Sequence, residues 1–181
     1  MPFKFQATRL EEVIVIESKS FLDERGYFKE TFKESDFHNY GIPTDFPQEN
    51  ESFSRKGVLR GLHYQLPPFS QGKLVRVISG KVFDVAVDLR KNSKYFGQWV
   101  AEVLSSENNL MLWIPPCFAH GFMALEDSIV CYRASREYSK EHERGVIWND
   151  PNIGIEWPLK QPTIIKRDME FPGLKEAILD F

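Results

Sequence analysis

Short apolar runs separated by turn residues recur along the chain. Runs of this length, with turn residues between them, are typical of the strands of a sandwich or barrel. The pattern predicts strands over residues 13–17, 25–32, 58–65, 74–78, 98–104, 111–114, 121–125 and 129–134.

The clearest alternation of apolar and polar positions lies between residues 83 and 89. Successive side chains of a strand point to opposite faces, so this segment predicts a strand with one apolar and one acidic face. The apolar face carries Phe83, Val85, Val87 and Leu89, and the other face carries Asp84 and Asp88.

Helical signals are weak. Residues 35–40 predict one or two helical turns, ended by Gly41 and Pro43, and residues 174–181 predict a C-terminal helix in which Leu174 and Ile178 share a face. About eight strands and a few short peripheral helices indicate an all-β fold, a cupin-like jelly-roll barrel or sandwich. The mouth of such a barrel holds a small-ligand pocket.

The composition narrows the class of protein. With 181 residues, 42% of them hydrophobic, residues 1–181 are expected to form one globular domain. The net charge of −3 gives no gross footprint for nucleic acid or an anionic membrane, and no stretch approaches the ~20 apolar residues of a membrane span. The first residues lack an apolar signal core, and Cys117 and Cys131 do not make a disulfide framework. We therefore expect a soluble cytoplasmic protein.

Four segments combine glycine or proline with side chains suited to acid–base or anion chemistry. A polar residue beside a tight backbone feature is either a site residue or part of a turn. The four segments are residues 57–65 (GVLRGLHYQ), 71–77 (QGKLVRV), 114–122 (IPPCFAHGF) and 143–151 (ERGVIWNDP).

These segments, in this order, resemble the dTDP-4-dehydrorhamnose 3,5-epimerase family. The resemblance extends over residues 13–168 and includes segments 23–28 and 48–50 and the Trp157–Pro158 pair. It implies a cupin-type jelly roll, a homodimer, and an isomerase that uses no metal or other cofactor. The implied reaction converts dTDP-4-dehydro-6-deoxy-D-glucose to dTDP-4-dehydro-L-rhamnose in dTDP-L-rhamnose biosynthesis.

That chemistry asks for particular residue types. The ketone acidifies the C3 and C5 protons, so a base on one ring face, an acid on the other and a cation near the enolate oxygen are needed. By the resemblance, His63 is the base, Asp168 orients it, Tyr132 is the acid, and Lys73 stabilises the enolate. An imidazole with a pKa of about 6.5 suits the base, and a phenol with a pKa of about 10 suits the acid.

The resemblance also implies a set of substrate-binding residues. Arg60 and Arg25 would contact the diphosphate, because the guanidinium fork suits phosphate oxygens. The segment with Arg25 and Glu30 would reach the pocket of the neighbouring subunit. The remaining contacts are expected from His120, a stacking Tyr138, and the polar side chains of Gln48, Asn50, Glu143 and Arg167.

Each of these residues also has a purely structural interpretation. A histidine in a strand is commonly a hydrogen-bonded core residue, tyrosine is common in strands, and most lysines are solvated. Arg60 and His63 have opposite parity in a regular strand, so both reach one pocket only if Gly61 marks a bulge or bend.

Three other functions compete with the epimerase. A metal-dependent cupin is disfavoured, because His63-Tyr64-Gln65 lacks a second histidine and a following glutamate. A non-catalytic sugar-nucleotide-binding module would not need both an acid and a base. An epimerase of C3 or C5 alone, acting on another 4-keto sugar, would use the same pair. Two positions depart from the family: Cys117 stands where glycine is more usual, and Arg167 where lysine is common.

Overall fold

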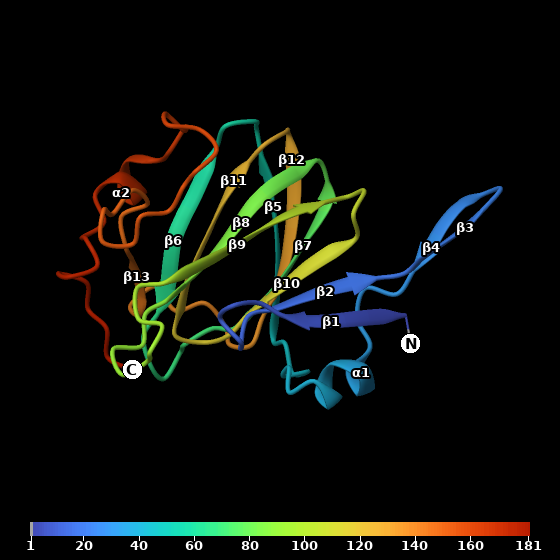
Figure 1. Cartoon of the computed structure of the whole chain (residues 1–181), viewed down its shortest axis with the longest axis horizontal. Coiled ribbons are helices and arrows are strands. Elements are labelled where there is room, and N and C mark those ends of the chain that lie inside the picture. Colours follow the sequence, from blue (N-terminus) through green and yellow to red (C-terminus); the bar gives the residue numbers. More distant parts are fainter. Residues whose placement is uncertain (1) are drawn as a thin grey trace.

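Two antiparallel sheets make up most of the computed structural model, which describes residues 2–181 (Figure 1). Met1, the first residue of the expected domain, lies outside the described residues. The six-stranded sheet has the order β1 (Phe3–Ala7), β2 (Ile14–Ser18), β10 (Leu110–Ile114), β7 (Lys73–Ser79), β12 (Ser128–Ala134) and β5 (Gln48–Ser54). The five-stranded sheet has the order β13 (Glu143–Gly145), β6 (Leu59–Gln65), β11 (Phe118–Ala124), β8 (Lys81–Asp88) and β9 (Trp99–Ser105).

The remaining elements are short and peripheral. A separate hairpin of β3 (Ser20–Asp23) and β4 (Gly26–Lys29) projects away from both sheets (Figure 1). Helix α1 (Glu34–Asn39) lies beside β1, and helix α2 (Lys166–Met169) lies at the far end of the molecule, near β6. The all-β jelly-roll prediction with short peripheral helices is therefore confirmed.

Three apolar layers hold the sheets together. The layer between the sheets contains inward-facing side chains of both, among them Val75 and Leu112 from one sheet and Val82 and Phe122 from the other. A second layer covers the outer face of the five-stranded sheet, and a third packs α1 on the outer face of the six-stranded sheet. Because both faces of most central strands are buried, the site between the sheets has a rigid frame.

The strand between residues 83 and 89 forms as predicted, as β8. Val85 and Val87 face the outer apolar layer, and Asp84 and Asp88 lie on the opposite face. That second face points into the space between the sheets, and both carboxylates are fully buried. An acidic face was predicted, and the structure shows that it lies in the interior.

Two predicted elements are wrong or incomplete. Residues 174–181 form no helix: Leu174 is buried, whereas Ile178 is 51% exposed, so the two side chains do not share a face. The segment follows Pro172–Gly173 and packs irregularly on the outer layer, where Tyr64 Oη donates to the Ile178 carbonyl at 2.8 Å. The predicted strand 25–32 is also shorter, because the chain turns at residues 24–25 and only Gly26–Lys29 pair.

Four strands and one helix were not predicted, namely β1, β3, β5, β13 and α2. The predicted helix over residues 35–40 and the other strands form within one to three residues of their expected limits. Cys117 and Cys131 are both free. Cys117 has φ +70°, a left-handed conformation that favours glycine.

The bend expected at Gly61 is present. Its φ is +128°, and the pairing of β6 with β11 shifts register between the His63–His120 and Arg60–Phe122 pairs. The two strands also approach each other closely there, since a Cβ on Gly61 would lie 2.5 Å from the Gly121 Cα atom. The bend cancels the parity difference, so Arg60 and His63 both line one cavity.

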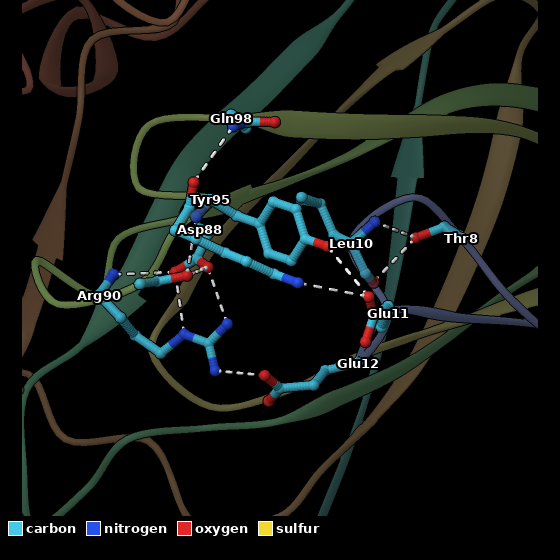
Figure 2. A network of polar contacts seen from close by, with 10 residues as sticks. Thr8, Leu10, Glu11, Glu12, Asp88, Arg90, Tyr95 and Gln98 are labelled. Atoms are coloured by element: carbon cyan, nitrogen blue, oxygen red, sulfur yellow. Dashed lines mark hydrogen bonds and ion pairs between the residues drawn. The ribbon is translucent and has the colours of Figure 1, made fainter.

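A polar cluster fastens the end of β8 to the loop between β1 and β2 (Figure 2). The Arg90 guanidinium donates to both oxygens of Asp88, at 2.9 and 2.7 Å, and to Glu12 Oε1 at 2.6 Å. Nearby, Tyr95 Oη donates to Glu11 Oε1 at 3.1 Å. The buried Asp88 carboxylate is thus fully satisfied by a bidentate partner, which makes it a structural acid.

Replacing Gly61 with alanine tests the close approach of β6 and β11. We expect Gly61→Ala to lose about 2–6 kcal/mol of unfolding free energy, from backbone strain of roughly 1–3 kcal/mol and a similar steric term. Gly26→Ala is the matched control, because Gly26 has φ +125° but nothing within 4 Å of its Cβ position. Urea denaturation measures both variants, and equal losses would contradict the steric argument.

Candidate active site

A cavity of about 470 Å³ lies between the two sheets. Its apolar wall includes Val58, Leu59 and Phe122, with Ile164 and Ile165 from the segment before α2; none of them was predicted as a site residue, although the first three lie in the segments singled out above. The predicted site residues that line it are Arg60, His63, Lys73, His120, Tyr132, Glu143, Arg167 and Asp168.

The imidazole of His63 is paired with Asp168. His63 Nε2 lies 3.0 Å from Asp168 Oδ2, the Asp168 side chain is 1% exposed, and that of His63 is 24% exposed. Strand β6 supplies the histidine and α2 the carboxylate, so the partners lie 105 positions apart in the sequence. The carboxylate fixes the imidazole tautomer, which leaves Nδ1 as the nitrogen able to accept a proton.

Asp168 is held ionised by several donors. Burial by itself would raise its pKa, but the hydrogen bond and charge of His63 oppose that effect. The Gly61 amide also donates to Oδ2, at 3.2 Å, and Arg167 Nε donates to Oδ1, at 3.2 Å. Together these groups lower the pKa of Asp168 below its ordinary value.

His63 also contacts Phe171 and Arg167. Phe171 packs edge-on against the imidazole, with ring centroids 5.6 Å apart. A Cβ on Gly145 would lie 2.3 Å from the Phe171 ring, so only glycine leaves room for it. Arg167 Nη2 lies 3.4 Å from His63 Nε2. The base is therefore positioned by packing as well as by its carboxylate.

Lys73 is a buried cation at the start of β7. Its side chain lines the cavity with its residue 9% exposed, and Nζ lies 5.7 Å from the centre of the Tyr132 ring. Burial lowers the pKa of Lys73 to about 8, although the charges of Asp84 and Glu143 oppose the shift. An ammonium in such a dry site stabilises a developing anion far better than it would in water.

Tyr132 stands on the opposite sheet from His63. It lies on β12, between Asn50 on β5 and Val75 on β7, and its ring centre is 6.5 Å from that of His120. Burial raises the pKa of Tyr132, with a further contribution from Glu143, while the Asn50 hydrogen bond and Arg60 oppose the rise. The phenol therefore remains protonated at neutral pH and can serve as an acid.

His120 has a carboxylate partner that the sequence analysis did not assign to the site. His120 Nε2 lies 2.8 Å from Asp84 Oδ1, and both side chains are buried. Burial lowers the pKa of His120, and the adjacent Asp84 only partly offsets this. The acidic face of β8 was the available signal, but an alternating pattern does not tell which face lies inside.

Glu143 joins the cavity to its rim. Its Oε2 accepts a hydrogen bond from Tyr138 Oη at 2.8 Å and pairs with Arg167 Nη1 at 2.9 Å. The Tyr138 backbone N–H donates to Gln48 Oε1 at 2.7 Å, and Gln48 Nε2 donates to Asn50 Oδ1 at 2.9 Å. These predicted binding residues thus form one connected polar edge, and Tyr138 is 50% exposed beside the opening.

Arg60, Arg25 and Glu30 complete the predicted set. Arg60 lines the cavity, with its guanidinium anchored by Nε to Ser54 Oγ at 2.9 Å and by Nη2 to the Phe53 carbonyl at 3.0 Å. Arg25 lies at the exposed turn of the hairpin and pairs with Asp23. Glu30 follows β4, and neither it nor Arg25 lines the cavity of its own chain.

Neither a metal cluster nor a membrane helix is found in the described part of the chain. Among residues 2–181, no group of three or more His, Cys, Asp or Glu side chains could hold a metal ion. No helix in the same range is long and apolar enough to cross a membrane. The absence of a cofactor stays a prediction.

Comparisons with known proteins agree with this geometry. The chain matches the family described as dTDP-4-dehydrorhamnose 3,5-epimerase over residues 7–176. A dTDP-4-dehydrorhamnose 3,5-epimerase from Shigella flexneri is 51% identical over 164 residues, which cover 90% of this chain and 91% of the relative.

Two solved structures superpose closely on the chain. The dTDP-4-dehydrorhamnose 3,5-epimerase from Sulfolobus tokodaii has a TM-score of 0.93 at 49% identity, and 99% of each chain is covered. A dTDP-6-deoxy-D-glucose-3,5-epimerase from Legionella pneumophila, in complex with dTDP-4-keto-L-rhamnose, has a TM-score of 0.93 at 43% identity. That match covers 96% of this chain and 94% of the other.

The buried Asp168 carboxylate predicts a pH-dependent contribution to stability. Because its pKa is lowered in the folded state, the contribution is present above the unfolded pKa of about 3.9 and is lost as the pH falls through the folded value. Asp168→Asn should cost about 1–3 kcal/mol at pH 7 and progressively less below about pH 4. Urea denaturation across this range measures the difference, and a constant gap would show that the carboxylate's ionisation is not what stabilises the fold.

Proposed function

The chain belongs to the dTDP-4-dehydrorhamnose 3,5-epimerase family, and from this we propose how it converts dTDP-4-dehydro-6-deoxy-D-glucose to dTDP-4-dehydro-L-rhamnose. It is an isomerase of the dTDP-rhamnose pathway with a cupin-type fold. The roles of individual residues, the assembly and the location are our proposals.

One observation carries the mechanism. The base, His63, stands on β6 of the five-stranded sheet, and the acid, Tyr132, stands on β12 of the six-stranded sheet. The cavity lies between these sheets, so a flat sugar ring bound in it would present opposite faces to the two groups. Epimerisation requires this arrangement, because the proton must leave from one face and return on the other.

The steps follow from the side chains in place. His63 Nδ1 accepts the proton from C3 or C5, and Asp168 stabilises the resulting imidazolium. The electron pair of the broken C–H bond forms a C=C bond to C4 and the carbonyl π pair moves onto the C4 oxygen, where the Lys73 ammonium stabilises the enolate. The carbonyl re-forms as Tyr132 donates its proton to the opposite face of the same carbon. Exchange with solvent then removes the proton from His63 and restores that of Tyr132 before the second carbon reacts. The substrate ketone is the electron sink, so we propose that no metal or organic cofactor takes part.

The connected polar edge supplies the contacts for the nucleotide. We assign Arg60 to the diphosphate, because its guanidinium is anchored at the cavity by Ser54 and the Phe53 carbonyl. Tyr138 lies exposed at the opening, where its ring can stack on thymine or the sugar. His120 and the side chains of Gln48, Asn50, Glu143 and Arg167 provide further polar contacts.

The projecting hairpin supports a homodimer with shared active sites. Leu22 is 83% exposed, Phe28 66%, Tyr27 62% and Phe21 47%, so four large apolar side chains of one hairpin face solvent in the single chain. Such a patch is typical of an interaction surface. We propose that the hairpin packs on a second copy of the chain and carries Arg25 and Glu30 into its cavity. We further propose that residues 1–181 work as one domain, in the cytoplasm.

Proton exchange in D₂O tests the reaction. With the purified protein and dTDP-4-keto-6-deoxyglucose, proton NMR should show deuterium entering at both C3 and C5 while the L-sugar accumulates. His63→Ala should abolish exchange and keep nucleotide binding nearly intact. Deuterium at one carbon only would identify a single-site epimerase. No exchange from protein shown to bind dTDP would indicate a binding module or another 4-keto sugar.

Tyr132→Phe separates the acid from the base. Because the phenol acts only in reprotonation, we expect product formation to slow by roughly 10²–10⁴-fold, with a smaller loss of C–H exchange. Ser52→Ala, which changes another cavity-lining hydroxyl, is the control. Equal losses of exchange and product formation in Tyr132→Phe would count against its role as the acid.

Mixed dimers test the shared site. Arg25→Ala and His63→Ala should each be nearly inactive. When they are unfolded together and refolded, half of the dimers are mixed, and one of the two sites in each is intact, so about a quarter of the wild-type activity should return. If Arg25 serves its own chain, both sites of a mixed dimer are defective and no activity returns.

A further inference from the structure

A buried carboxylate oxygen close to the active site has no partner. Asp84, on β8, is fully buried, and only its Oδ1 is hydrogen-bonded, to His120 Nε2 at 2.8 Å. Among residues 2–181, Oδ2 has no hydrogen-bond partner. Leaving a buried acceptor unsatisfied costs stability, so such an atom calls for an explanation.

The second inward-facing acid of the same strand shows the contrast. Asp88 is equally buried, but its oxygens accept from Arg90 at 2.9 and 2.7 Å and from Ser93 Oγ at 2.6 Å. Arg90 belongs to the cluster of Figure 2, and both donors line a separate surface hollow, away from the cavity. Strand β8 thus carries one acid that the fold satisfies and one that it leaves half satisfied.

Lys73 is the buried cation that lacks a partner. Within the described residues, its ammonium has no carboxylate oxygen within 4.0 Å and no hydrogen bond to another side chain or carbonyl. Its Nζ instead lies over the face of the Tyr132 ring. Lys73 and His120 line the same cavity, and Asp84 lies directly behind His120. The charge of Asp84 favours the protonated form of Lys73 more than any other charge does.

Other charged or titratable groups face the same space from neighbouring elements. Glu143 favours the charged form of Lys73, and Lys73 and His63 disfavour that of His120, so the whole set belongs in any argument about pH. The set comprises Arg60 and His63 from β6, His120 from β11, Tyr132 from β12, Glu143 from β13, and Arg167 and Asp168 from α2.

We propose that Asp84 is a positioning residue, whose unpaired carboxylate oxygen leaves a negative charge available as the counter-charge of the buried Lys73 ammonium and whose other oxygen holds His120 in place. This inference rests on the proposed function, because the charged Lys73 matters through the enolate. Burial alone disfavours an ammonium, and Glu143 is already engaged by Tyr138 and Arg167. Asp84 is the nearby acid whose second oxygen is engaged by no other donor of the described chain. Leaving Oδ2 without a donor costs stability, but it also leaves the negative charge of Asp84 free to act on Lys73.

The test compares Asp84→Asn with Asp88→Asn. Both replace a buried acid of β8 with an amide of the same shape, but only the first lies behind His120. Urea denaturation should show a lower midpoint for Asp88→Asn, which breaks the Arg90 pair, and an unchanged or higher midpoint for Asp84→Asn.

The kinetic readout is kcat against pH with dTDP-4-keto-6-deoxyglucose. If Asp84→Asn lowers the pKa of Lys73 by about one unit, kcat should fall about fivefold at pH 8 but less than twofold at pH 6.5, with KM nearly unchanged. Asp88→Asn should leave the ratio to wild type flat over this range. A pH-independent loss in Asp84→Asn, or the same slope in both variants, would overturn the proposal.

A direct titration needs no turnover. Lysines labelled with ¹³C at Cε, with the Lys73 resonance assigned from its loss in Lys73→Arg, report the pKa of Lys73 in each folded protein. We expect it to fall in Asp84→Asn and to stay near the wild-type value, about 8, in Asp88→Asn. An unchanged Lys73 pKa in Asp84→Asn would overturn the inference even if the reaction is as proposed. A shifted pKa in a protein that does not epimerise would instead refute the proposed function alone.

Discussion

The Asp168 carboxylate is the contact on which the arrangement of the site depends. It accepts from His63, from the Gly61 amide and from Arg167, and so ties α2 to the bent part of β6. Because it is almost wholly buried, its charge survives only while these donors stay in place, and they stay in place only while it is charged. The orientation of His63 and the docking of the C-terminal segment therefore depend on the same carboxylate.

The same low-dielectric space assigns different tasks to similar groups. Asp168 is satisfied by three donors and remains a stable anion, whereas Asp84 keeps one oxygen without a partner. Burial lowers the pKa of Lys73 to about 8 and raises that of Tyr132. The ammonium therefore titrates close to neutral pH, whereas the phenol stays protonated there. Epimerisation at neutral pH requires Lys73 and Tyr132 to be protonated at the same time.

Much of the fold could be predicted because β8 alternates clearly and most other strands are short apolar runs bounded by turn residues. The errors occur where the spacing of apolar residues in the sequence does not match which of them the fold buries. Leu174 and Ile178 have helical spacing, but the segment lies across an apolar sheet face, so Leu174 is buried by tertiary contact and Ile178 is not. Strand β5 was missed because its run of Gln, Glu and Asn side chains gives no apolar signal, although backbone pairing with β12 holds it.

Part of the candidate site could be predicted from the sequence. The resemblance identified most of the polar residues that line the cavity but not its apolar wall, and the parity problem at Gly61 correctly implied a bend. It could not show that Asp84 faces inward behind His120, because a period of two fixes which residues share a face and leaves open which face is buried.

Arg167 connects two parts of the site through a single side chain. Its Nη1 pairs with Glu143 while its Nε donates to Asp168, so a single planar group spans the polar edge and the base's carboxylate. The ammonium of a lysine is a single point charge and could not hold both groups in this fixed geometry. In this chain, therefore, the side chain beside Tyr138 and the carboxylate beside His63 share one donor.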